Sequence, residues 1–182
     1  MDTRPPFKGA RNLSRSREEK SKSLIWDKSN AFNRLVLISA FSGGVSSVAK
    51  TILSAIFYYA GYSTWFNLMD AGAVIFRTTT FLLDFWHLAF AMATHILWGS
   101  VLGVGLGLTY LLVGRNHYLI IGSFYGFFIW IVVRNFFATI SLQEGLPELG
   151  VASVTISFPS HILWGALAGF LIVRLFPIKK VN

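Results

Sequence analysis

Four apolar runs, each long enough to cross a lipid bilayer, constrain this chain more than any other feature of its sequence. They cover about residues 34–61, 85–113, 118–140 and 151–176. A bilayer core requires roughly 20 apolar residues per helix. Because lipid offers the backbone no hydrogen-bonding partners, each run is expected to form a helix rather than an open strand. The sequence therefore predicts an all-α fold, a four-helix transmembrane bundle.

Charge is concentrated ahead of the first run. Only 13% of the 182 residues are charged, against 54% that are hydrophobic, and much of the charge lies at or before Arg34. We therefore expect two parts: residues 1–31 as a disordered, basic cytoplasmic tail and residues 32–182 as a four-span transmembrane domain. The tail either attracts anionic lipid head groups, at about 1 kcal/mol per basic residue, or acts only as an orientation signal.

The distribution of basic residues predicts the orientation in the membrane. The N-terminal segment, the turn after the second run and the C-terminal end hold nearly all of them, whereas the two remaining loops hold only Arg77. Lysine and arginine stay on the cytoplasmic side, so both termini are expected to be cytoplasmic and the protein to lie in the plasma membrane. The net charge of +8 is then a topology signal, and we expect no nucleic-acid partner.

Two segments of the chain repeat. HILWGSVLG at His95–Gly103 matches HILWGALAG at His161–Gly169, and more weakly Ala40–Gly43 resembles Ser123–Gly126. The chain is therefore expected to be two tandem helical hairpins, a parallel repeat about a pseudo-two-fold axis along the membrane normal.

Small residues recur at a spacing of four in all four runs, which allows helix backbones to approach closely. The glycines expected at helix contacts are Gly43, Gly99, Gly103, Gly107, Gly122, Gly126, Gly165 and Gly169.

Four side chains that can carry positive charge lie inside the runs at similar depth, in the outward half of the predicted bundle: Lys50, His95, Arg134 and His161. Charged groups inside a membrane are costly, so they usually face the protein interior or a wet cavity and have a partner. Carboxylates that could pair with them lie near the outer ends of the runs, namely Asp84 and Glu144, together with Asp70 and Glu148.

Three interpretations of this polar cluster follow. The groups are paired internally, or they form an outward-facing basic pocket for an anion or a lipid phosphate. A metal site built from His87, His95, His161 and Asp84 is the third, although two histidines on one helix are weak evidence without a third ligand at a known spacing. We expect no cofactor or resident metal.

Other features narrow the chemistry. The chain has no cysteine, which excludes disulfides and thiolate sites, and it carries none of the common hydrolase, metalloprotease or phosphate-loop motifs. Pro159, two residues before His161, either starts the fourth helix or kinks it.

The stretch FSGGVSSVAKTIL at 41–53, the apolar loop Tyr62–Asp84 and the closing HILWGALAGF at 161–170 resemble the YqhR-like four-span membrane proteins of Gram-positive, often spore-forming bacteria. The resemblance covers about Leu35–Phe176. It implies a multi-pass plasma-membrane protein and brings no activity or functional residues with it.

The sequence thus favours a non-enzymatic structural or accessory membrane protein that acts by helix packing with itself, as a homo-oligomer, or with a membrane protein partner. A small transporter or anionic-ligand binder that uses Lys50, Arg134, His95 and His161 is the alternative, and a membrane-embedded metalloenzyme is the third.

Overall fold

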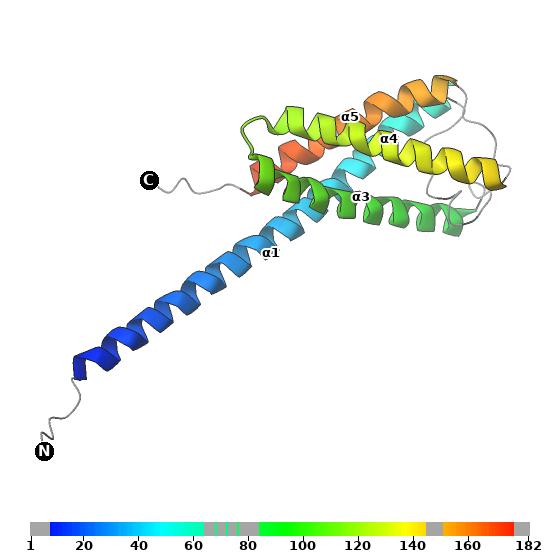
Figure 1. Ribbon diagram of the computed structural model, residues 1–182. Helices are drawn as coiled ribbons and strands as arrows, with labels where there is room; N and C mark the ends of the chain where they lie inside the picture. The colour runs from blue at the N-terminus through cyan, green and yellow to red at the C-terminus, as the bar shows by residue number, and fades with distance from the viewer. Residues whose placement is uncertain are drawn as a thin grey trace, which may run out of the picture. The chain divides into compact units, whose positions relative to one another are not determined.

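Four α-helices make up the fold in a computed structural model, which describes the backbone of residues 8–63, 84–144 and 151–176 and three positions between the first two ranges. Side chains are described for 29–63, 84–136, 154–176 and the same three positions. The helices are α1 (Lys8–Tyr59), α3 (Phe85–Val113), α4 (Tyr118–Glu144) and α5 (Val151–Leu175), and the described part of the chain contains no strand (Figure 1). The predicted all-α, four-helix bundle is confirmed.

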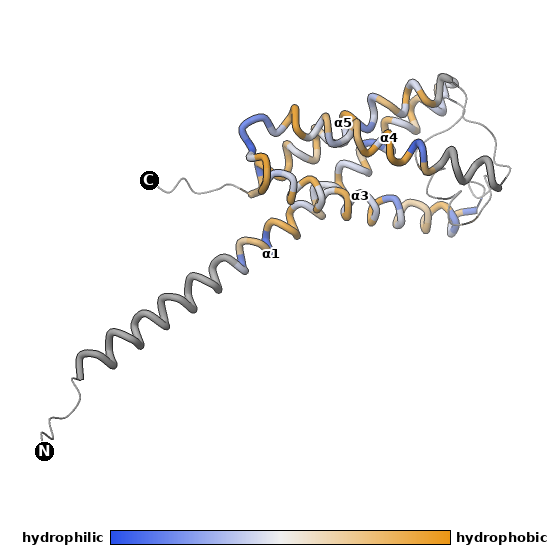
Figure 2. The backbone as a smooth tube through the Cα atoms, in the orientation of Figure 1, coloured by the Kyte–Doolittle hydropathy of each residue, from blue (hydrophilic) through white to orange (hydrophobic). Residues whose placement is uncertain are grey.

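Each helix carries a segment that is long and apolar enough to cross a membrane: Ser29–Tyr59, Phe85–Val113, Tyr118–Phe136 and Val154–Leu175. The shortest of these has 19 residues, about 28 Å at 1.5 Å per residue, which matches the thickness of a hydrocarbon core. Apolar residues run along all four helices in Figure 2. The chain is therefore a multi-pass membrane protein, as the sequence predicts.

The disorder expected for residues 1–31 is not confirmed in the part of this segment that the structure describes, residues 8–31. The backbone is helical from Lys8 onward, continuous with the first span. Starting a helix is the costly step, and extending one that the membrane already stabilises costs little where Arg, Lys and Glu favour the helical state. Residues Met1–Arg34 and Leu35–Asn182 form two separate units.

The apolar composition of Tyr62–Asp84, between α1 and α3, predicts an interfacial or partly re-entrant segment, and most of this loop lies outside the described residues. Three positions in it, Leu68, Gly72 and Phe76, are helical. Leu68 is buried together with Ala91 of α3. These residues cover the end of the bundle at which α1 ends and α3 begins.

Local signals set the limits of α3. Asp84 is its N-cap, and the carboxylate accepts the backbone N–H of Trp86 at 2.9 Å. Gly114 ends the helix at a φ of 88°, a conformation that favours glycine, and its N–H bonds the carbonyl of Tyr110 at 3.1 Å. The Tyr110 hydroxyl then donates to the carbonyl of Tyr118 at 2.7 Å, which holds the tight turn into α4.

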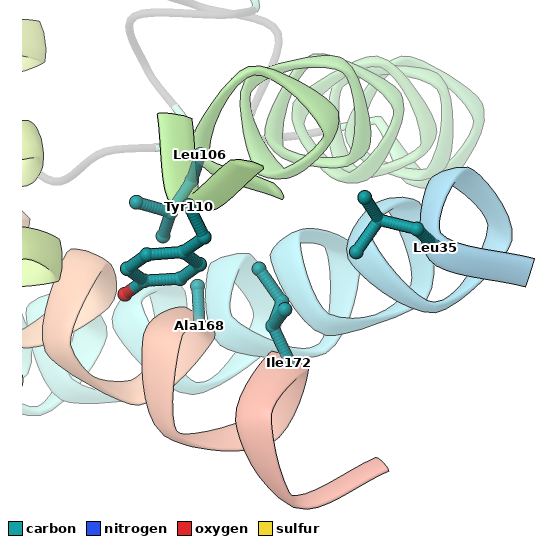
Figure 3. Packing of buried hydrophobic residues seen from close by; sticks show 5 residues of the cluster. All are labelled: Leu35, Leu106, Tyr110, Ala168 and Ile172. Carbon is teal, nitrogen blue, oxygen red and sulfur yellow. The ribbon is translucent and has the colours of Figure 1, made fainter. Parts of the chain in front are cut away.

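A cluster of buried side chains joins three helices near this turn (Figure 3). It comprises Leu35 of α1, Leu106 and Tyr110 of α3, and Ala168 and Ile172 of α5. Lipid tails are as apolar as these side chains, so close packing rather than exclusion of water stabilises the contact.

Glycine contacts hold the helices together in two pairs. All eight glycines expected at helix contacts are buried. A methyl group on Gly43 of α1 would overlap the carbonyl oxygen of Gly99 and lie 2.7 Å from the Cα of Gly103. A methyl group on Gly165 of α5 would likewise overlap the carbonyl oxygen of Gly122 of α4. Only glycine permits backbones to approach so closely.

The two helix pairs use the same register. Gly99 and Gly165 occupy equivalent places in the two HILWG segments, and they contact Gly43 and Gly122, respectively. By their contacts, Gly43 and Gly122 are therefore equivalent positions in the two helix pairs. The sequence comparison instead aligned Gly43 with Gly126, one helical turn further along α4. Glycines recur every four residues in α4, so their spacing alone does not select between Gly122 and Gly126.

Candidate intramembrane polar site

One face of α1 is lined with polar side chains that are buried inside the bundle. They are Ser39, Ser42, Ser46, Ser47, Lys50, Thr51 and Ser54. A small hydroxyl side chain buried in an apolar helix can donate to the carbonyl one turn earlier, as Ser46 Oγ does to the carbonyl of Ser42 at 2.7 Å. Lys50 is the one charged residue in this set.

Lys50 is bonded to a histidine 111 residues away in the sequence. Its Nζ lies 2.7 Å from Nε2 of His161 on α5. The other ring nitrogen, Nδ1, lies 2.8 Å from the carbonyl oxygen of Ser157. A carbonyl can only accept, so Nδ1 carries a hydrogen and the Nζ–Nε2 contact holds one proton between its two nitrogens. When His161 is neutral, Lys50 is the donor.

This contact reduces the cost of burying the lysine. Lys50 lies nine residues from the end of α1, about 14 Å into the span, and 9% of its surface is exposed. A lysine near the centre of a membrane helix costs about 2.5–3.5 kcal/mol. A hydrogen bond that involves a charged group contributes about 1.5–3 kcal/mol, so the bond to His161 offsets much of that cost.

Pro159, two residues before His161, affects the backbone hydrogen bonding of α5 next to the Lys50–His161 pair. Pro159 lies well inside α5, so it does not start the helix, and the first of the two alternatives for it is wrong. It has no N–H to bond the carbonyl of Thr155, one turn earlier. On the following turn Ser160 Oγ and His161 Nδ1 both donate to the carbonyl of Ser157, at 2.7 and 2.8 Å.

His95 of α3 is the second histidine of the cluster. Its Nε2 is buried and has no hydrogen-bond partner among the described residues, and the same is true of Oγ1 of Thr51 on α1. His95 interacts electrostatically with both Lys50 and His161. The structure therefore brings together three of the four cationic candidates from α1, α3 and α5.

Three further candidates are Arg134, Asp84 and Glu144. Arg134 is half-buried on α4. Asp84 is exposed at the start of α3 and pairs with His87 on the same helix. The side chain of Glu144 lies outside the described residues. Within the described part of the chain, no group of three His, Cys, Asp or Glu residues is placed to hold a metal ion.

Trp164 is a residue of the site that the sequence did not single out. Its indole nitrogen donates to the carbonyl of Gly43 and to the hydroxyl of Ser47, each at 3.1 Å, and 3% of its surface is exposed. Trp98, at the same place in the other HILWG segment, is 56% exposed. No local signal distinguishes the two tryptophans, because their immediate neighbours are identical.

The fold and the site together define a four-helix, multi-pass membrane protein with a lysine–histidine pair buried in its bundle. No family model matches the chain, and no curated protein or solved structure matches it significantly.

Proposed function

We propose that this protein is a non-enzymatic structural or accessory protein of the bacterial plasma membrane, which acts by packing its helices against itself or a membrane protein partner. The bond between Lys50 and His161 carries this proposal. Both side chains are buried and bonded to each other inside the bundle, as expected of groups that stabilise a fold. Among the residues with described side chains, large hydrophobic side chains are exposed on all four helices.

A double-mutant cycle tests whether this pair is structural. Lys50→Met and His161→Leu should each lower the midpoint of thermal unfolding in detergent, because each leaves a buried partner without its hydrogen bond. The double variant should lose less than the sum of the two single losses. Additive losses would show that the two side chains act independently and would contradict a structural pair.

Helix packing as the mode of action has its own test. Native mass spectrometry from detergent, with lipids retained, should show a defined homo-oligomer or a stoichiometric complex with a membrane protein. Lys50→Met with Arg134→Met should leave the binding of anionic lipids unchanged. A protein that is only monomeric and loses its anionic lipid in that double variant would reject the proposal.

A basic pocket for an anion or a lipid phosphate is the second candidate. The proximity of Lys50, His95 and His161 favours it, since three groups that can be cationic share one region of the membrane. Saturable binding of an anionic lipid that disappears in the double variant is the result expected from this candidate. Arg134 belongs to the test because the sequence places it at similar depth.

Orientation is proposed from the charge distribution. Both termini lie in the cytoplasm, the basic N-terminal segment faces anionic lipid head groups, and the resemblance to YqhR-like proteins supports the plasma membrane as the location. The chain has no cysteine, so single cysteines report position without a background. In intact cells an impermeant maleimide should label Ser141→Cys but not Ser16→Cys or Asn182→Cys. Labelling of Ser16→Cys would reverse the topology.

A further inference from the structure

Oγ1 of Thr51 on α1 and Nε2 of His95 on α3 are buried and have no hydrogen-bond partner among the described residues. The same holds for one side-chain atom each of four further residues: Ser39, Ser42, Arg115 and Trp130. Nearby, His161 bonds Lys50 and Trp164 bonds Ser47. Within the described part of the chain, Thr51 and His95 are the unpartnered pair on facing helices next to Lys50. Inside a membrane no bulk water reaches such atoms, so unpaired groups on facing helices indicate something that bonds both.

The helix register places these two atoms on facing positions. On α1, Gly43 and Ser47 contact Gly103 and Gly99, respectively. The two helices are antiparallel, so moving four residues forward along α1 corresponds to moving four residues back along α3. One further turn brings Thr51 opposite His95. Beyond them, Ala55 packs with the buried cluster that includes Ala91, which continues the same register. Thr51 and His95 therefore face each other as a polar pair in an α1–α3 interface that otherwise consists of small residues.

The local charge selects what such a site can hold. Lys50 precedes Thr51 in the chain and interacts electrostatically with His95. An ammonium group and a hydroxyl both donate hydrogen bonds, and a neutral imidazole donates from one of its two nitrogens. A cation placed here would be repelled by Lys50, whereas a small acceptor would be attracted.

We propose that Thr51 and His95, beside Lys50, form an intramembrane site for one small hydrogen-bond acceptor, either a water molecule or a monovalent anion such as chloride. A guest of one heavy atom matches two or three convergent donors, which is the number that a buried water usually has. It connects His95 to the Lys50–His161 pair, so that hydrogen bonds extend across α3, α1 and α5. This inference is independent of the proposed accessory function.

The direction in which a single substitution shifts the midpoint of thermal unfolding tests the site. Thr51→Val removes the hydroxyl and keeps the shape of the side chain. If a guest bonds Oγ1, the variant loses that bond and the midpoint of thermal unfolding of the full chain in detergent falls by about 2–4 °C. If Oγ1 has no partner, removing it leaves the midpoint unchanged or raises it, and the proposal is overturned.

A matched control and a second variant keep the test decisive. Thr109→Val removes a hydroxyl that donates to the carbonyl of Gly105 at 2.9 Å, and it calibrates the loss of an ordinary hydroxyl bond. His95→Leu removes the other side of the site. With a shared guest, Thr51→Val costs less in the His95→Leu background than in the wild type. Equal costs in both backgrounds would overturn the shared site.

Two measurements distinguish the guests. For an anion, the midpoint rises with chloride when gluconate holds ionic strength constant, the rise disappears in Thr51→Val, and bromide gives anomalous density at the site. For water, the midpoint is independent of chloride, and NMR shows magnetisation transfer between water and the ring of His95. Absence of both the chloride dependence and the water transfer would overturn the proposal.

Discussion

Trp164 of α5 donates its indole N–H to the carbonyl oxygen of Gly43 on α1, 3.1 Å away. Gly43 is also the residue that permits α1 and α3 to touch through their backbones. One glycine therefore connects three of the four helices. Its missing side chain brings α3 close, and its carbonyl anchors α5.

Trp164→Phe should destabilise the bundle by about 1–2 kcal/mol, because the indole loses two hydrogen-bond acceptors and the smaller ring leaves a gap. Trp98→Phe is the matched control from the other HILWG segment. Its side chain is 56% exposed, so the change should stay within about 0.5 kcal/mol. Thermal or SDS unfolding in mixed micelles measures both, and equal losses would refute the difference between the two tryptophans.

Gly43→Ala should separate α1 from α3. The new methyl group meets backbone atoms of Gly99 and Gly103, which have no rotamer to change, so we expect a net loss of about 1–3 kcal/mol. Gly44→Ala is the control, because its methyl group meets the Ser100 hydroxyl at 2.8 Å, and that side chain can rotate away. Stability of the Gly43 variant equal to that of the Gly44 variant would contradict the backbone contact.

Tyr110→Phe should weaken the turn between α3 and α4. The substitution removes the 2.7 Å bond to the carbonyl of Tyr118 from a side chain that is 2% exposed, at a cost of about 0.5–1.5 kcal/mol. Tyr59→Phe, at a position that is 80% exposed, should change the unfolding midpoint little. Faster hydrogen exchange of amides at 114–118 in the Tyr110 variant alone would locate the effect.

The cap of α3 should respond to acid. The hydrogen bond from the Trp86 amide, and then the one from His87, lowers the pKa of Asp84 below its ordinary 3.8. The carboxylate is thus favoured in the folded state, so its contribution to folding is complete above pH 3.8 and is lost as the pH falls through the lowered pKa. Carbon NMR of the Asp84 carboxyl should give a midpoint below 3.8.

Asp84→Asn is the control for this titration, because asparagine can still cap the helix and does not ionise in this range. Its helical content should be independent of pH between 2 and 5, where the wild type loses structure at the start of α3. A wild-type midpoint at or above 3.8 would contradict the cap geometry.

The polar cluster shows which residues of the site can be predicted from the sequence. Sequence patterns selected Lys50 and His161 as buried cations, because charge inside an apolar run needs a reason. They grouped Arg134 with Lys50 because both lie at similar depth, yet the contact register of the two helix pairs does not make these two residues equivalent. Depth along a helix follows from the sequence, whereas the direction of a side chain around the bundle depends on how all four helices are rotated.

The two tryptophans of the HILWG segments show even more clearly that the direction of a side chain cannot be predicted from the local sequence. Trp98 and Trp164 share the local sequence HILWG, yet one faces outward and the other is buried against Gly43. Identical neighbours cannot specify different partners, so the difference arises from the helices that surround each segment.

By itself, the sequence determined the number of membrane helices and, for α3, both of its limits. In lipid each backbone must bond within its own helix, and that constraint acts locally along the chain. Only the tertiary structure decided that Lys50 meets His161 and that Trp164 rests on Gly43, because these contacts depend on the rotation and register of helices far apart in sequence. Close packing of small residues sets that rotation, and its energy exists only once the helices are together.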